Sequence, residues 1–158
     1  MGAGDLESLF PRLRGSGYQI TSEQADQPNC IGWALYSNLY FDPGGSVMGG
    51  YYWPPGVRRD DSLEAWSEVF ALHNYRDCDA DAVEPDSEKI AIYVGPDGDP
   101  WHVARQLTSG EWTSKLNKLE DIRHPTLDAL VGAHYVRIAK IMKRPREGVT
   151  AADRSDRR

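Results

Sequence analysis

The chain has 158 residues, 40% of them hydrophobic, and its 24 acidic and 18 basic side chains give a formal net charge of −6. This length suits one globular domain with a core that needs neither disulfides nor a structural metal. No run approaches the roughly 18 apolar residues that cross a bilayer, and the N-terminus lacks a secretory signal pattern, so we expect no membrane contact and a cytoplasmic location.

The charge is unevenly distributed along the chain. Residues 137–158 hold eight basic and three acidic side chains, a net charge of +5, which leaves −11 for residues 1–136. An acidic body argues against a nucleic-acid groove across the main domain. We expect one domain over residues 1–145 and a basic, disordered tail over residues 146–158.

The first half of the chain predicts short helices separated by loops. Residues 5–14 predict a helix that a proline interrupts, and residues 20–28 predict a loop. Asn29 is a favourable N-cap residue, so a helix is expected from Cys30 to Tyr36. Glycine, proline and aromatic residues fill residues 42–56 and predict an irregular loop.

An amphipathic helix is expected next. Asp61 and Glu64 resemble a capping box with the aspartate in the cap position. Apolar residues then recur at helical spacing over residues 63–73. Residues 77–88 carry six acids in twelve positions, which predicts a solvated loop.

The second half of the chain predicts an antiparallel sheet. Three consecutive strands are expected over residues 89–94, 101–107 and 111–116. A short helix near residues 126–131 and a last strand near residues 134–142 complete the domain, and residues 143–158 are expected to fray. Helices followed by an antiparallel meander predict the α+β class.

Cys30 is the strongest candidate for a catalytic nucleophile. It lies at a predicted helix start, where unpaired backbone N–H groups and the helix dipole stabilise an anion. Gly32 leaves room beside it for a substrate. A free cysteine is otherwise most often a small core residue, and the polar Asn29 before it favours the catalytic interpretation.

His102 is the candidate base, because it opens the second predicted strand and a thiol nucleophile needs a neighbouring imidazole. A histidine at a strand entrance is otherwise usually exposed and idle. A third group commonly orients the imidazole. Ser114, twelve residues further on, is preferred for this role, with Gln106 and His124 as open alternatives.

Four tryptophans are candidates for substrate binding, and they either line a cleft or cap the core. They are Trp33, Trp53, Trp101 and Trp112. The chain shows no metal-ligand spacing and no nucleotide-binding glycine loop, so we expect no metal and no cofactor. Its two cysteines, Cys30 and Cys78, are too few for a disulfide framework.

The chain resembles the NlpC-type cell-wall peptidases of the papain-like superfamily. In these enzymes a cysteine opens a helix, a histidine opens a later strand, and a polar third member follows about twelve residues on. The resemblance implies a papain-like fold in which helices pack on an antiparallel sheet, with Cys30, His102 and Ser114 as the catalytic residues. The cysteine precedes the histidine, unlike the order in circularly permuted acyltransferase relatives.

A closer resemblance is to a family of small bacterial proteins of undefined activity in or near that superfamily. It covers most of residues 18–145. The matching segments are residues 29–34, 53–54, 89–93, 102–107 and 112–116. Two departures from the NlpC pattern are Asn29 in place of an aspartate and Ser114 in place of a third histidine. Residues 36–50 form a longer, glycine-rich loop than the closer family has.

The sequence and these resemblances predict a cysteine-dependent hydrolase or acyltransferase. Its substrate would be a peptide or a small amide-containing molecule, attacked by Cys30 with His102 as base. The alternative is a catalytically inactive binding module of the same fold. A toxin or a biosynthetic tailoring enzyme is a third possibility.

Overall fold

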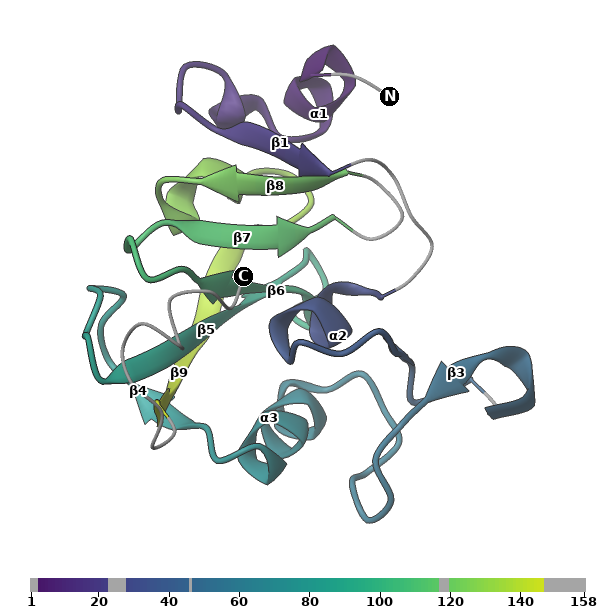
Figure 1. Cartoon of the computed structure of the whole chain (residues 1–158). Helices are drawn as coiled ribbons and strands as arrows, with labels where there is room; N and C mark the ends of the chain where they lie inside the picture. Colours follow the sequence, from purple (N-terminus) through teal and green to yellow (C-terminus); the bar gives the residue numbers. More distant parts are fainter. Residues whose placement is uncertain (1–2, 23–27, 46, 117–119, 147–158) are drawn as a thin grey trace.

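A seven-stranded antiparallel sheet forms the centre of the computed structural model, which describes residues 3–22, 28–45, 47–116 and 120–146 (Figure 1). The class is therefore α+β. In spatial order the strands are β1 (Gln19–Ser22), β8 (Asp121–His124), β7 (Trp112–Lys115), β6 (Pro100–Gln106), β5 (Ser87–Val94), β9 (Arg137–Pro145) and β4 (Arg76–Cys78). The three consecutive strands expected over residues 89–116 are confirmed as β5, β6 and β7.

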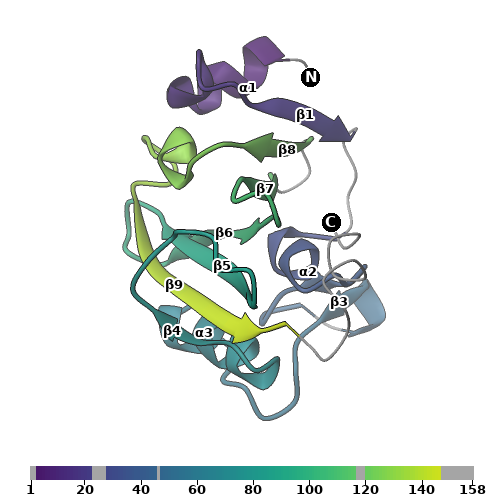
Figure 2. The ribbon, with the colours of Figure 1, turned by 60° about the vertical axis from the view of Figure 1, so that its left-hand side comes forward.

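Two apolar cores lie on the two faces of the sheet, because successive side chains of a strand point to opposite sides. In β5, Ile90 and Ile92 enter one core, whereas Ala91 and Tyr93 enter the other. Helices α2 (Cys30–Ala34) and α3 (Leu63–Leu72) contribute to the first core. Helix α1 (Ala3–Leu9) and the 3-10 turns η1 (Pro11–Leu13) and η3 (Leu127–Leu130) contribute to the second. Figure 2 shows α1 beside β1, well separated from α2 and α3.

The first helix ends where proline requires it. Helix α1 stops at Leu9, and Pro11 starts η1, so the expected interruption is confirmed. The burial of Leu6, Phe10 and Leu13 ties this segment to the second core.

Helix α2 begins at Cys30, as expected, with the Asn29 side chain accepting from the Gly32 N–H at 3.3 Å. The prediction that it extends to Tyr36 is wrong. Tyr36 has a φ of 59°, and the Ser37 N–H donates to the Gly32 carbonyl at 2.8 Å. This reversal closes the helix after Ala34.

Helix α3 confirms the amphipathic helix, with Trp66 and Phe70 buried beneath it. The N-cap lies one residue after Asp61, the residue expected in that position. Ser62 is the N-cap, and its hydroxyl accepts from the Ala65 N–H at 3.1 Å. The Asp61 carboxylate instead accepts from the indole N–H of Trp66 at 3.3 Å.

The loop expected over residues 20–28 is wrong for residues 20–22, which belong to β1, and residues 23–27 lie outside the described part. All four residues of β1 are exposed, so the strand has no apolar alternation to reveal it. It is defined by its pairing with β8, where Ser22 donates to Asp121 and Arg123 donates to Gln19. Strand β8 itself was not expected.

The acidic segment over residues 77–88 is also more ordered than expected. It contains part of β4 and the start of β5. Glu84 pairs with the buried Lys89 at 2.7 Å, and the buried Glu88 pairs with Arg144 at 2.9 Å. Pairing of Ser87, Glu88 and Lys89 with β9 extends that strand to Pro145, past the end expected at residue 142. Of the expected tail, residues 147–158 lie outside the described part.

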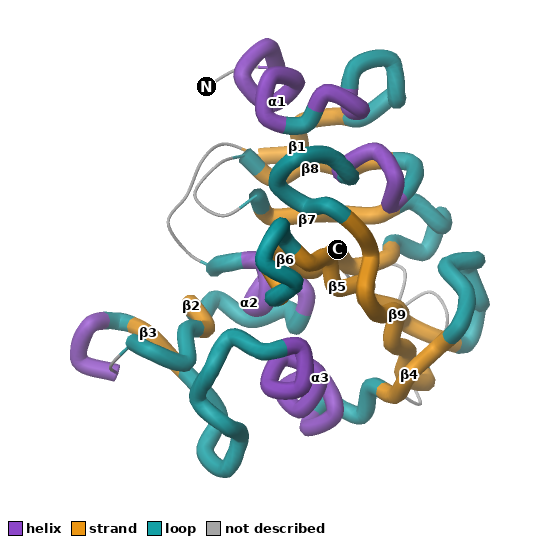
Figure 3. Tube along the Cα trace, turned by 180° about the vertical axis from the view of Figure 1, so that it is seen from behind, coloured by secondary structure: helices purple, strands orange, loops and turns teal. Residues whose placement is uncertain are grey.

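A small arm projects from the domain between α2 and α3 (Figures 1 and 3). It contains β2 (Tyr40–Phe41), the 3-10 turn η2 (Val47–Gly49) and β3 (Tyr51–Tyr52). Strands β2 and β3 pair in parallel over two residues each, so the irregular loop expected over residues 42–56 is confirmed in large part. Within the described residues, every helix is too short or too polar to cross a membrane.

Candidate active site

The structure brings the two principal candidates, Cys30 and His102, to one pocket of about 450 Å³. Cys30 enters from the N-terminus of α2, which packs against β6 and β7. His102 enters from β6. The remaining walls come from residues of both apolar cores, among them Phe10, Phe41, Trp66 and Tyr135.

The position of His102 follows from a short ladder between β6 and β7. These strands pair only at Arg105 with Thr113 and at Gln106 with Trp112. Towards His102 the regular pairing stops. His102 and Ser114 share a face of the sheet and meet across this end through their side chains.

A buried chain of hydrogen bonds runs from the imidazole of His102 into the domain. His102 Nε2 lies 2.9 Å from Ser114 Oγ, and the same hydroxyl lies 2.8 Å from His124 Nε2. His124 Nδ1 lies 2.8 Å from the carbonyl oxygen of Thr126. Two of the three candidates for the third group, Ser114 and His124, therefore act in series.

The partners in this chain allow one order of protons when both imidazoles are neutral. The Thr126 carbonyl only accepts, so His124 Nδ1 carries the proton and His124 Nε2 accepts from the Ser114 hydroxyl. The Ser114 oxygen then accepts from the Nε2–H of His102. His102 Nδ1 is left with a free lone pair, and it has no hydrogen-bond partner among the described residues.

Burial keeps both imidazoles neutral. It lowers the pKa of His102 to about 3, helped by the charge of His124, and it lowers the pKa of His124 to about 4 against the opposing effect of the Thr126 carbonyl. His102 is 1% exposed and His124 is fully buried. The assigned proton order therefore holds throughout the neutral pH range.

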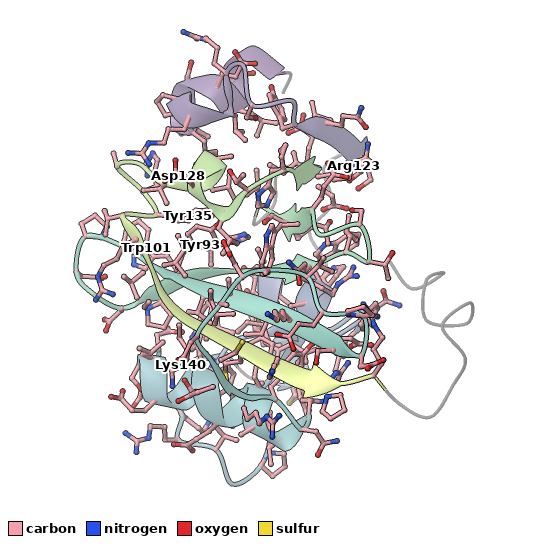
Figure 4. All side chains as sticks on the ribbon, turned by 90° about the vertical axis from the view of Figure 1, so that its left-hand side faces the viewer. Tyr93, Trp101, Arg123, Asp128, Tyr135 and Lys140 are labelled. Atoms are coloured by element: carbon pink, nitrogen blue, oxygen red, sulfur yellow. The ribbon has the colours of Figure 1, made fainter. Side chains whose placement is uncertain are left out.

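Two tyrosines hold the His102 ring from the sides. The Tyr135 ring stacks on it with centroids 4.8 Å apart and an interplanar angle of 2°. Tyr93 packs at 5.5 Å, and its hydroxyl donates to the Leu127 carbonyl at 2.6 Å. Figure 4 shows Tyr93 and Tyr135 close together below η3. Nothing in the sequence pattern around Tyr135 indicated this role.

The Cys30 thiol differs from the sequence expectation of an activated thiolate. It is 8% exposed, and burial raises its pKa to about 11. The backbone N–H groups of Val103, Ile31 and Cys30 oppose this rise, and the charge of Asp61 adds to it. Among the described residues no hydrogen bond joins Cys30 to His102, so the resting site holds a neutral thiol and a neutral imidazole.

The small size of Gly32 serves packing rather than substrate access. A Cβ atom there would lie 2.2 Å from the Leu39 carbonyl oxygen and 2.8 Å from the Pro28 Cβ. The expectation that it leaves room for a substrate is therefore wrong, because the chain after α2 already fills that space.

Gln106, the third candidate to orient His102, lies away from the site. Its amide donates to the carbonyls of Asp81 at 2.6 Å and Gly110 at 3.4 Å. These bonds tie the acidic segment to β6. Gln106 lies at the opposite end of β6 from His102, so it does not reach the imidazole.

Of the four tryptophans considered for substrate binding, Trp101 alone lines the Cys30 pocket, and it is 43% exposed. The Trp33 indole donates to Thr113 Oγ1 at 3.1 Å and fixes α2 to β7. The Trp53 indole donates to the Arg58 carbonyl at 3.0 Å. Trp53 and Trp112 are core residues, since they are 4% and 2% exposed.

Among the described residues, no group of three or more His, Cys, Asp or Glu side chains could hold a metal ion. Both cysteines are free, and Cys78 lies in β4, far along the sheet from the pocket.

Comparison with known proteins finds one family. A family model described as "Domain of unknown function (DUF7689)" matches residues 19–143. No curated protein and no solved structure matches the chain. The matched region contains Cys30, His102, Ser114, His124 and Tyr135 but not α1 or η1.

Proposed function

The chain belongs to the DUF7689 family of domains of unknown function, and from the geometry of its pocket we propose that it is a cysteine-dependent hydrolase or acyltransferase. Cys30 is the nucleophile, His102 is the general base, and the substrate is a peptide or small molecule with an amide or acyl bond. Ser114 and His124 orient the base.

The observation that supports this proposal most is the hydrogen-bond chain behind His102. It fixes the ring and directs the Nε2 proton inward to Ser114, which leaves Nδ1 as the basic atom in a residue that lines the Cys30 pocket. An imidazole held in one tautomer by a third group is the arrangement that general-base catalysis needs.

The proposed reaction starts from the neutral pair. Cys30 Sγ attacks the carbonyl carbon while His102 Nδ1 takes the thiol proton, so an S–C bond forms and the electron pair moves to the oxygen. When this tetrahedral intermediate collapses, the bond to the leaving nitrogen or oxygen breaks, and that atom takes the proton from Nδ1. Water or an amine then attacks the thioester, gives its proton to Nδ1 and displaces the sulfur, which takes that proton back.

With a pKa of about 11 for the Cys30 thiol and about 3 for His102, a stored thiolate–imidazolium pair is unfavourable, so the proposal requires the proton to move only as the sulfur attacks the carbonyl. The thiolate is not stored in the resting site but forms as its proton moves to His102, and the pocket stays uncharged until a carbonyl is present. Backbone N–H groups that favour sulfur anion, including that of Val103, also offer donors near the developing negative charge.

The relation to papain-like enzymes is supported by the order of the elements, with a cysteine at the start of a helix before a histidine in the sheet. A cytoplasmic location accords with two free cysteines.

The test is acylation by 4-nitrophenyl acetate at pH 7, followed by intact mass and peptide mapping. We expect one acetyl group on Cys30 and a loss of about 100-fold in its rate in His102→Ala. Cys78→Ala is the matched control and should acylate like the wild type. Labelling of Cys30 that does not depend on His102, or that is no faster than labelling of Cys78, would contradict the proposal.

A binding module is the second candidate, favoured by the absence of a hydrogen bond between Cys30 and His102 among the described residues and by the raised thiol pKa. In that case the pocket binds its ligand without covalent chemistry, and Cys30 acylates slowly in both wild type and His102→Ala.

A further inference from the structure

The formal charges that line the Cys30 pocket are all negative. They belong to Asp42, which follows β2, and to Asp61, which precedes α3; the described lining contains no lysine or arginine, and its basic side chains are the histidines His102 and His134. Asp61 is close enough to Cys30 for its charge to act on the thiol. A pocket that places carboxylates and no cation around a reacting carbonyl selects against anionic substrates.

Aromatic rings form most of the remaining wall. They are Phe10, Tyr40, Phe41, Trp66, Trp101 and Tyr135. Aromatic faces attract cations through their quadrupole, and the attraction grows when the site is partly desolvated. Aromatic rings combined with carboxylates are therefore a suitable environment for an ammonium or guanidinium group.

The pocket also contains a polar atom that is prepared for a ligand. His102 is 1% exposed and lines the pocket, and its Nδ1 has no hydrogen-bond partner among the described residues. The acidic side chains therefore surround a built site rather than a plain patch of surface.

We propose that the substrate of this site is cationic: an amide or acyl compound with an ammonium or guanidinium group close to the bond attacked, held by Asp42, Asp61 and the aromatic wall. This rests on the proposed function, since it names the substrate class of the same site. An amine acceptor in acyl transfer would be recognised in the same way.

The probes are arginine amide, its neutral near-isostere citrulline amide, and glutamate amide. Each is tested for its ability to slow the alkylation of Cys30 by iodoacetamide at pH 8.5 in the Cys78→Ala protein. We expect arginine amide to protect Cys30 at a concentration about tenfold lower than citrulline amide, as for one charge-assisted contact, and glutamate amide not to protect. Equal protection by arginine and citrulline amides would overturn the proposal.

Charge-removing variants locate the effect. Asp42→Asn and Asp61→Asn keep the oxygen that accepts from the Gly44 N–H and from the Trp66 indole, so the local fold is retained while the charge is lost. Each should reduce the preference for arginine amide several-fold. Asp86→Asn is the matched control, since Asp86 is exposed beside the start of β5 and outside the pocket lining. An undiminished preference in both pocket variants would also overturn the proposal.

The two proposals fail separately. Charge-selective protection combined with no His102-dependent acylation retains the cationic pocket and overturns the thiol enzyme. His102-dependent acylation combined with equal protection by charged and neutral amides does the reverse.

Discussion

At the scale of single residues, Ser114 is the link on which the arrangement depends. It is fully buried, and its one hydroxyl serves both histidines. A serine suits the position because a hydroxyl can donate and accept at once. Where the NlpC pattern has a histidine, this chain has Ser114, and His124 lies one hydrogen bond further from His102.

We predict that Ser114→Ala lowers the free energy of unfolding by about 1–3 kcal/mol, because it leaves a buried ring nitrogen of each histidine without its partner. It should also reduce His102-dependent acylation of Cys30 about tenfold, since the ring can then adopt the other tautomer. Urea unfolding and the acylation assay measure the two effects. Ser109→Ala, at an exposed turn, is the control, and a Ser114→Ala protein as stable as that control would contradict the assignment.

The buried histidines also predict a pH dependence of stability. The pKa values of His102 and His124 are lowered in the folded chain to about 3 and about 4, whereas unfolded histidine titrates near 6.5. Below about pH 6.5 the unfolded chain binds protons that the folded chain refuses, so stability is complete above that pH and is lost as the pH falls.

Each such histidine contributes a slope of about 1.4 kcal/mol per pH unit below that point. His124→Gln should therefore show a shallower fall in the free energy of unfolding between pH 6.5 and pH 5 than the wild type, by about that slope. Urea titrations at several pH values measure it. Parallel curves for the two proteins would show that His124 is not held neutral.

Sequence alone could nominate residues of the pocket only where the side-chain type itself suggests a chemical role. Cys30 and His102 were singled out because a thiol at a helix start is a favourable position for a nucleophile and such a nucleophile needs an imidazole as its partner. Tyr135 and the link from Ser114 to His124 were not, because a stacked ring and a shared hydroxyl depend on how distant strands meet. Of the two alternatives left open for the tryptophans, a cleft or the core, the core holds for Trp53 and Trp112, because burying a large ring contributes most there.

At the scale of elements, the start of α2 is fixed by Asn29 in two directions. Its Oδ1 accepts from Gly32 N–H and from Phe41 N–H at 3.1 Å, and its Nδ2 donates to the Phe41 carbonyl at 2.7 Å. The side chain therefore caps α2 and also bonds to both the N–H and the carbonyl of Phe41, as a neighbouring strand would. An aspartate cannot donate to that carbonyl, which is a physical reason for asparagine at this position.

We predict that Asn29→Asp is destabilising by about 1–2 kcal/mol despite its equal size, because two acceptors then face each other. It keeps the helix cap, so the loss reports on the Phe41 contact alone. Asn29→Ala removes both functions and should cost more, including about 1 kcal/mol for the cap. Urea unfolding of the two variants measures the difference, and equal stability of Asn29→Asp and wild type would contradict this account.

Helices and strands with an apolar pattern in their own sequence were predictable. Strands that are defined only by hydrogen bonds to a neighbouring strand were not. Helix α3 has apolar residues at helical spacing, and β5 contains the continuous apolar run Ile90–Val94. Strand β1 is exposed along its length and β4 is polar, so each exists only through its partner in the sheet. The papain-like expectation, drawn from motifs, remains part of the proposal.

At the scale of the whole molecule, a row of rings connects the end of the first helix to His102. Phe10 packs on Tyr135 with centroids 5.1 Å apart, and Tyr135 stacks on His102. Leu9 and Phe10 also line the pocket. The segment before residue 19, outside the matched family region, is thus part of the site wall in this chain.

We predict that Phe10→Ala lowers the free energy of unfolding by about 3–5 kcal/mol, as expected for removal of a buried aromatic ring. It should also lower acylation of Cys30 under conditions where the variant remains folded, because Tyr135 loses the ring that holds it. Leu72→Ala, at an exposed position of α3, is the control for a large-to-small change. Unchanged acylation in folded Phe10→Ala would show that Tyr135 is held without it.

The residues in this row of rings lie far apart in the sequence, so they are synthesised at different times. During synthesis the chain leaves the ribosome from its N-terminus, so Phe10 and Cys30 emerge long before His102, His124 and Tyr135. Cys30 is therefore made before His102, and His102 before Tyr135, whose ring stacks on it. The contact between Phe10 and Tyr135 joins residues 125 positions apart, so it belongs to the slow, long-range part of folding. A chain that has emerged only as far as α3 therefore carries Cys30 without His102 or Tyr135 beside it.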